Sequence, residues 1–259
     1  MIETLAGSGE PGFVGDGGSA RLACLNEPKN VALDCRGGLF IADSENHVIR
    51  KMDLATGLIC TVAGCPPSGG QPVSPKPQSG ARQEPDPLEE DPFAEPVPTS
   101  RARYTQQRDL SGMVRFVVGS GPSETRFHGD GGPALDATLN FPSAIVVDHR
   151  GNLYIADTMN HRVRKVDADT RTITTVAGTG QHRWSGDNGA ATEAALNEPA
   201  ALALDERGGR AVLYIADQSN NRVRRMDLKT GIMTTVAGTG ESAYAGDGGP
   251  AVEACLAGP

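Results

Sequence analysis

The residues best suited to chemistry lie in a short glycine-rich motif that recurs along the chain. It reads Gly-Asp-Gly-Gly at residues 15–18, 129–132 and 246–249, and Gly-Asp-Asn-Gly at residues 186–189. An aromatic residue stands two positions before each leading glycine, so every motif offers a carboxylate, a ring and an adaptable backbone. The candidate binding residues are Phe13, Asp16, Phe127, Asp130, Trp184, Asp187, Tyr244 and Asp247.

The motif matches neither a phosphate loop nor a calcium loop. A phosphate loop places Lys and Ser or Thr between a strand and a helix, whereas this motif has no Lys and its aspartate would repel phosphate. An EF-hand loop needs several acids, and each motif supplies one. Two interpretations remain. One is a ring of aromatic and acidic groups at a pore mouth, which would bind a sugar, a peptide or a cation. The other is a structural corner, which repetition in every copy favours.

Three long repeats, at residues 25–64, 139–178 and 196–238, supply the elements between the motifs. Each repeat holds four short runs rich in Val, Ile, Thr and Tyr, bounded by Asp, Asn or Gly, which is typical of β-strands. The repeats recur at a period near 57 residues. Four antiparallel strands per repeat predict an all-β fold made of β-propeller blades. In the second repeat the expected strands are residues 144–148, 153–157, 162–167 and 172–177.

The run "NLYIADTMNHRVRKVD" in the second repeat resembles the NHL repeat. The triplet that names this family reads Asn46-His47-Val48, Asn160-His161-Arg162 and Asn220-Asn221-Arg222 here, so no copy matches to the letter. The links "TVAGTG…GDGGPA…L" resemble the longer variant of teneurin-type and many bacterial NHL propellers. The resemblance covers the chain outside residues 65–112 and implies the fold. It leaves function open, because such propellers include sensors, adhesion modules, RNA binders and lyases.

Residues 65–112 break the pattern, since they hold 10 of the 18 prolines. Proline cannot donate to a strand ladder, so this stretch predicts a disordered, proline-rich insert. We therefore expect a first propeller part at residues 1–64, the insert at 65–112 and a second propeller part at 113–259. The insert fills one blade period and is followed by "SGMVRFVVGSG", which predicts a fourth strand. Either the insert replaces the first three strands of a blade, or it is a linker of similar length.

The two ends of the sequence bear on assembly. Pro259 aligns with Pro28, Pro142 and Pro199, which open the first strands of the repeats, and the chain starts inside a fourth strand. Three complete blades plus partial ones are too few for the ~4–8 blades of a closed propeller. One hypothesis is that the chain is part of a longer, six-bladed propeller. The rival hypothesis is a homodimer in which two copies complete the ring.

Charge and composition favour binding over catalysis. The net charge of −8 argues against a nucleic-acid partner and leaves RNA binding as a lesser alternative. Arg162, Arg164, Arg222 and Arg224 are expected at solvated or ion-paired strand edges. Aspartates and asparagines that repeat in every copy are expected to form turns. They are Asp43, Asp157, Asp217, Asn46, Asn160 and Asn220.

The five histidines, His47, His128, His149, His161 and His182, give no nucleophile–base pair with a third orienting group. We expect no catalytic residue, no metal and no cofactor. The preferred function is a protein- or ligand-binding scaffold. The alternative is a propeller lyase or hydrolase with its site at the channel mouth, since lyases that this fold resembles use histidine ligands there.

The five cysteines suggest reduced thiols, because their number is odd and no C-x-x-C pair occurs. No run approaches the ~18 consecutive apolar residues of a membrane-spanning helix. No signal peptide precedes the first motif. The sequence as given therefore favours a cytoplasmic location.

Overall fold

The computed structural model describes residues 2–65, 106–108, 114–116 and 127–259. The chain divides into two compact units, one of residues 1–75 with 125–259 and the other of residues 76–124. Most of the predicted disordered insert lies outside the described residues. The three-part division of the chain therefore stays a prediction.

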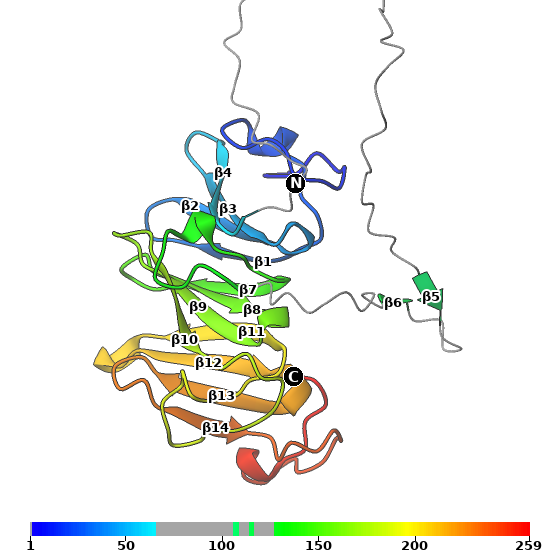
Figure 1. Ribbon diagram of the computed structural model, residues 1–259, viewed down its shortest axis with the longest axis vertical. Helices are drawn as coiled ribbons and strands as arrows, with labels where there is room; N and C mark the ends of the chain where they lie inside the picture. The colour runs from blue at the N-terminus through cyan, green and yellow to red at the C-terminus, as the bar shows by residue number, and fades with distance from the viewer. Residues whose placement is uncertain (1, 66–105, 109–113, 117–126) are drawn as a thin grey trace, which may run out of the picture. The chain divides into compact units, whose positions relative to one another are not determined.

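The first unit contains three four-stranded antiparallel sheets (Figure 1), and its described residues include no α-helix. Each sheet runs in chain order from its first to its fourth strand, as expected for propeller blades. Blade 1 consists of β1 (Pro28–Leu33), β2 (Gly38–Asp43), β3 (Val48–Asp53) and β4 (Ile59–Ala63). Blade 2 consists of β7 (Pro142–Val147), β8 (Leu153–Asp157), β9 (Arg162–Val166) and β10 (Ile173–Ala177). Blade 3 consists of β11 (Pro199–Asp205), β12 (Val212–Asp217), β13 (Arg222–Asp227) and β14 (Met233–Ala237).

The predicted strands of the second repeat are confirmed to within about two residues at each end. The blades meet along their first strands, because β7 lies beside both β1 and β11. First strands are therefore innermost, and the fourth strands β4, β10 and β14 form the outer edges of the sheets. Near its beginning, each third strand shifts register against the fourth, between Ile49 and Arg50 in blade 1.

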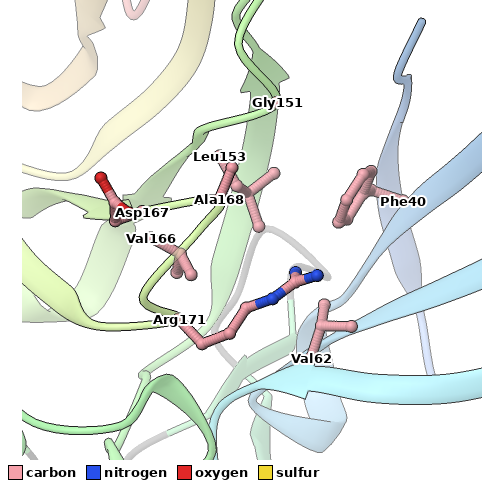
Figure 2. Close-up of a pocket in the computed structure, with 8 residues that line it drawn as sticks. All are labelled: Phe40, Val62, Gly151, Leu153, Val166, Asp167, Ala168 and Arg171. Atoms are coloured by element: carbon pink, nitrogen blue, oxygen red, sulfur yellow. The ribbon is translucent and has the colours of Figure 1, made fainter. Parts of the chain in front are cut away.

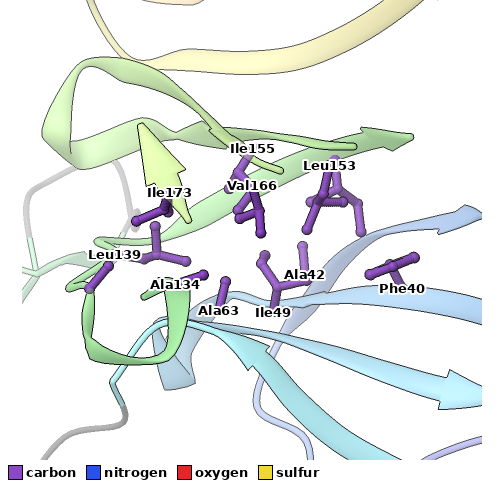
Figure 3. Close-up of a cluster of buried hydrophobic side chains, with 12 residues drawn as sticks. Phe40, Ala42, Ile49, Ala63, Ala134, Leu139, Leu153, Ile155, Val166 and Ile173 are labelled. Carbon is purple, nitrogen blue, oxygen red and sulfur yellow. The ribbon is translucent and has the colours of Figure 1, made fainter. Parts of the chain in front are cut away.

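The core lies between blades rather than within one sheet. In Figure 3, Phe40, Ala42 and Ile49 of blade 1 point toward Leu153 and Ile155 of blade 2. A second cluster joins blades 2 and 3 in the same way. Burial of apolar side chains on both faces of each blade is what stabilises stacked repeats, since a single repeat cannot bury its own faces.

Short 3-10 turns occupy the ends of the strands and the links. Those between second and third strands are η2 (Ser44–Asn46), η4 (Thr158–Asn160) and η6 (Gln218–Asn220). Each is followed by a residue in the left-handed region, His47, His161 or Asn221. Three more 3-10 turns lie in the glycine-rich segments outside the sheets, η1 (Ala20–Leu22) before blade 1, η3 (Ala134–Asp136) between blades 1 and 2, and η7 (Ala251–Glu253) after blade 3. η5 (Arg207–Gly209) lies in the extended first hairpin of blade 3.

The second unit contains an antiparallel pair, β5 (Gln106–Arg108) and β6 (Val114–Phe116). Strand β6 falls inside the run predicted to be a fourth strand. Strand β5 shows that the segment expected to lack strands contains one at its proline-free end. In this pair Gln106 aligns with Phe116 and Arg108 aligns with Val114.

The insert does not separate blade 1 from blade 2. At the end of β4, Gly64 N donates to Ala134 O at 3.0 Å and Cys65 N donates to Ala137 O at 2.8 Å. The uninterrupted link after β10 makes the same bonds, from Gly178 N to Ala191 O and from the next amide to Ala194 O. The chain between Cys65 and Phe127 is therefore an insertion into an otherwise ordinary link.

Candidate functional site

The recurring glycine motifs form four corners, of which the second and third join two blades, the first precedes blade 1 and the fourth follows blade 3. We define corners 1 to 4 as residues 8–25, 127–139, 180–196 and 240–256. In corner 2, Gly131 N donates to Ile173 O and Ile173 N donates to Gly132 O, at 2.8 and 3.0 Å. The corner thus extends the outer edge of blade 2, while Ala134 O holds the end of blade 1. These bonds place the corners against the outermost strands.

Each of the first three corner aspartates binds an arginine from the third strand of the following blade. In blade 2, Arg164 Nη2 lies 2.7 Å from Asp130 Oδ1 and Arg164 Nη1 lies 3.7 Å from Asp157 Oδ2. The guanidinium also donates to the carbonyls of His128 and Thr138, at 3.3 and 3.0 Å. The equivalent arginines and their aspartates are Arg50 with Asp16 and Asp43, and Arg224 with Asp187 and Asp217.

These arginines are fully buried, so the expectation of a solvated strand edge is wrong for Arg164 and Arg224. The ion-paired part of that expectation is confirmed, including at the neighbouring Lys165, which lies 3.8 Å from Asp167. Strand alternation puts Arg162 and Arg164 on one face, and both guanidinium groups lie over the ring of Phe127. Corner 2 covers this face of the strand. The alternation of side chains along a strand shows which residues share a face, but not which face is covered.

The turn aspartates have a second role that the sequence interpretation missed. Asp157 Oδ1 accepts a bond from Asn140 N at 2.7 Å, and Oδ2 accepts one from Asn160 Nδ2 at 2.9 Å. The predicted turn at this position is confirmed, but its carboxylate is also buried beside Arg164. The sequence feature that could have predicted this contact between aspartate and arginine is the spacing Asp-x-x-Asn-x-x-x-Arg. It recurs unchanged at residues 43–50, 157–164 and 217–224.

Burial dominates the electrostatics of these carboxylates. It raises the pKa of Asp157 to about 6, although Asn160, Asn140 and Arg164 act in the opposite direction. Burial raises the pKa of Asp43 and of Asp217 in the same way. A raised pKa at a buried carboxyl often marks chemistry, but here the same shift repeats in every blade beside the same arginine. Such repetition indicates a structural network.

The corner aromatics differ in how much of the ring reaches solvent. The ring of Phe13 lies 5.0 Å from the guanidinium of Arg50, and the ring of Phe127 lies 3.7 Å from that of Arg162. Trp184 lies 4.3 Å from Arg222 and is 43% exposed. Tyr244 is 88% exposed, and its hydroxyl donates to Asp247 at 2.8 Å. The third and fourth corners therefore present aromatic surface that the first two largely cover.

Three of the histidines have structural or surface roles. His47 Nδ1 and His161 Nδ1 accept backbone bonds from Phe141 and Glu198, both at 3.1 Å. Burial, with His182 adding to it, lowers the pKa of His161. His149 lies in the first hairpin of blade 2 and is largely exposed. Its Nδ1 lies 2.6 Å from Glu206 Oε1, which ties that hairpin to blade 3.

The described residues contain no cluster of three or more His, Cys, Asp or Glu that could hold a metal ion. A small cleft between blades 1 and 2 is lined by Phe40, Val62, Leu153 and Arg171, among others (Figure 2). Its volume of about 10 Å³ suits no more than a single water molecule. Cys24, Cys35, Cys60 and Cys255 carry free thiols. Among the described residues no helix is long and apolar enough to cross a membrane.

Comparisons with known proteins agree with the fold. Residues 99–185 match the model of the teneurin NHL domain. The chain is 34% identical over 142 aligned positions to NHL repeat-containing protein 2 of Homo sapiens, covering 53% of this chain and 19% of that protein. It is 25% identical over 296 positions to Protein SUPPRESSOR OF QUENCHING 1, chloroplastic, of Arabidopsis thaliana, covering 89% of this chain and 27% of that protein.

A solved structure also has a similar fold. It is a structural genomics protein of unknown function from Bacteroides thetaiotaomicron, with a TM-score of 0.51 and 18% identity. The match covers 89% of this chain and 40% of that one. The chain thus spans a minor part of the proteins it resembles, and these matches bear on the architecture of the blades.

Proposed function

Because this chain folds as blades of an NHL-repeat β-propeller, we propose that it is a non-catalytic scaffold that binds a protein or a small ligand at its corners. The observation that supports this most directly is the exposed aromatic surface of Trp184 and Tyr244. Exposed rings with a neighbouring polar group are typical of recognition sites, since they contribute large contact areas at low entropic cost.

The corner aspartates would contribute less to such binding than the rings. Asp16, Asp130 and Asp187 each hold a buried arginine, so their charge is largely neutralised within the protein. Arg222 extends the binding surface instead. It stacks over Trp184 and donates to the carbonyls of Thr239 and Asn220, which joins corner 3 to the residue just before corner 4. The proposed site is therefore centred on Trp184, Arg222 and Tyr244.

The test uses arrays of immobilised peptides and glycans, probed with the full chain. We expect a reproducible set of bound features, and a loss of at least about tenfold in Trp184→Ala, because interface aromatics dominate binding. Leu54→Ala is the matched control, since Leu54 is an exposed side chain in a third-to-fourth-strand turn. Binding that Trp184→Ala and Tyr244→Ala leave unchanged would place recognition elsewhere on the chain.

A propeller enzyme is the second candidate, and the His149–Glu206 pair is the observation that favours it. A carboxylate on Nδ1 holds the imidazole in one orientation, which is how enzymes position a base or a metal ligand. A lactonase and lyase turnover screen combined with metal analysis tests this candidate. Turnover that is lost in His149→Ala would replace the scaffold proposal. Identity of the partner and formation of a homodimer stay predictions.

A further inference from the structure

One hydrogen bond between blades 2 and 3 depends on the protonation state of a histidine. His161 follows η4 with a φ of 53°, and its Nδ1 accepts a bond from Glu198 N at 3.1 Å. Glu198 stands immediately before Pro199, the first residue of β11. We propose that this bond is an acid-sensitive joint, in which protonation of His161 releases the start of β11 from the turn of blade 2.

The chemistry of imidazole makes the bond conditional. A neutral ring accepts at one nitrogen and donates at the other, whereas an imidazolium ion donates at both. Nδ1 of His161 can therefore accept from Glu198 N while the ring is neutral and carries its proton on Nε2. Protonation would set two N–H groups against each other and leave a part-buried amide without its acceptor. Since an unmade bond at such a donor is costly, the charged ring and the amide must separate.

The backbone that this bond holds is strained. Glu198 has a φ of 53°, in the left-handed region that residues other than glycine rarely adopt. A residue before a proline is normally extended, and Pro199 has no N–H that could replace the amide of Glu198 as a donor. A strained conformation persists while its surroundings hold it. Loss of the bond to His161 therefore favours an extended Glu198.

Two further bonds between blade 2 and the start of β11 come from hydroxyl groups. Thr158 Oγ1 donates to Pro199 O at 2.9 Å, and Ser143 Oγ donates to Ala200 O at 2.9 Å. A hydroxyl keeps its proton where a histidine titrates, so these bonds do not depend on pH in that range. They hold blade 3 against blade 2 when His161 is charged. The proposed change is therefore confined to the residues just before β11.

Among the described residues, the charged and titratable groups that face His161 come from three elements. They are His182 of corner 3, whose ring centroid lies 5.7 Å away, Arg162 of β9, and Glu198 at the start of blade 3. Burial is the largest effect and lowers the pKa of His161, with His182 and Arg162 acting in the same direction and Glu198 in the opposite one.

The lowered pKa sets the direction of the response. The unfolded chain binds a proton at His161 more readily than the folded chain does, so the contribution of the joint to stability is full above the ordinary pKa of 6.5. This contribution is lost as the pH falls through the lower, folded-state value. The joint is therefore closed at neutral pH and opens in acid.

Blade 3 carries the same bond with a side chain that does not titrate. Asn221 occupies the position of His161, has a φ of 51°, and accepts from Gly258 N through Oδ1 at 3.0 Å. Acceptor and donor are 37 residues apart in both cases. An amide oxygen accepts at any pH, and asparagine tolerates the left-handed conformation. His161→Asn should therefore keep the bond to Glu198 N and remove its dependence on pH.

The experiment measures hydrogen exchange at the Glu198 amide of the full chain by nuclear magnetic resonance. Between about pH 7.5 and about pH 5, after correction for the intrinsic exchange rate, we expect protection to fall at least about tenfold as His161 titrates. In His161→Asn it should stay within about twofold over the same range. Asp157 also titrates there but is present in both proteins. Coincident thermal unfolding at neutral pH shows that the variant is folded.

A second variant, His182→Asn, separates titration of His161 from a merely structural role. It removes a group that lowers the pKa of His161, so the pH at which Glu198 loses protection should rise. The nitrogen resonances of His161 at neutral pH should also place its proton on Nε2. A proton on Nδ1, an unmoved midpoint in His182→Asn, or equal loss of protection in the parent chain and in His161→Asn would each overturn the proposal. So would unchanged protection of Glu198 once His161 is charged.

Discussion

At the scale of single residues, each blade holds one fully buried arginine between two carboxylates, a buried one from the turn and a partly exposed one from the corner. Desolvation of the charges opposes this arrangement, and the Coulomb attraction and hydrogen bonds offset it only when every partner is present. In blade 2 those partners are Asp130, Asp157 and two backbone carbonyls. The arginine joins a corner, a turn and a strand, so it fixes the path of the link to its blade.

Loss of the arginine should therefore cost more than a surface ion pair. We expect Arg164→Met to lower the free energy of unfolding by about 3–5 kcal/mol, because two carboxylates are left without a cation. Lys165→Met, which disturbs only a partly exposed pair with Asp167, should cost about 1 kcal/mol or less. Urea denaturation measures both. Arg164→Met combined with Asp130→Asn and Asp157→Asn should be more stable than Arg164→Met alone. An equal loss of stability in the triple variant and in Arg164→Met alone would show that unpaired carboxylates are not the cause of the loss.

The raised pKa of Asp157 predicts a specific pH dependence. Since the folded-state pKa is about 6 against an ordinary value of 3.8, the folded chain keeps this proton where the unfolded chain has released it. Asp157 contributes fully to stability below its ordinary pKa of 3.8. This contribution is lost as the pH rises to the folded-state pKa of about 6. The loss amounts to about 3 kcal/mol. Denaturation of Asp157→Asn at several pH values should show no such loss from this position. If the free energy of unfolding changed with pH in the same way in the parent chain and in Asp157→Asn, the raised pKa of Asp157 would be contradicted.

At the scale of elements, the corner depends on glycine where two backbone segments meet. Gly186 has a φ of +86°, and a Cβ there would lie 2.5 Å from the Cα of Ala194. Gly131 also has a positive φ, but a Cβ there would meet no atom within 4 Å. Corner 3 carries Asn188, with a φ of 62°, at the place of Gly131. The two glycines therefore serve different purposes, close approach in one case and turn geometry in the other.

This difference predicts opposite results for two substitutions. Gly186→Ala should destabilise the chain by about 2–4 kcal/mol, because it adds a backbone clash to the strain of a positive φ. Gly131→Asn should change stability by less than about 0.5 kcal/mol, since asparagine tolerates this conformation. Thermal unfolding of the two variants beside the parent chain measures the contrast. A similar loss in both would show that φ alone matters at the corner.

The blades were predictable from sequence because their signals are local. Runs of Val, Ile and Thr bounded by Asp, Asn and Gly located the four strands of the second repeat to within about two residues. The burial of the corner arginines was not predicted, because Arg164 meets Asp130 across 34 residues and the alternation of a strand does not show which face a link covers. The exposure of Trp184 and Tyr244 likewise depends on which strands and side chains pack over each corner, and spacing along the chain does not encode that packing.

At the scale of the molecule, stability arises mainly where blades meet. The clusters between blades 1 and 2 and between blades 2 and 3 contain the fully buried Ile155 and Leu213, whereas the innermost strand of blade 1 exposes Val31 and Leu33. In a linear stack of repeats, each interface couples only its two neighbours. The described blades should therefore unfold together as long as both interfaces are intact, and should separate when one is weakened.

Ile155→Ala tests this coupling, because Ile155 lies in the cluster between blades 1 and 2. We expect a loss of about 2–5 kcal/mol from the cavity. The single tryptophan, Trp184, lies in the corner between blades 2 and 3 and reports on that end of the stack. Urea unfolding followed by tryptophan fluorescence and by far-ultraviolet circular dichroism should give one midpoint for the parent chain.

In Ile155→Ala the circular dichroism midpoint should fall further than the fluorescence midpoint. Val31→Ala, at an exposed site on the first strand of blade 1, should leave the two midpoints together. Coincident midpoints in Ile155→Ala would show instead that the three blades unfold as one cooperative unit.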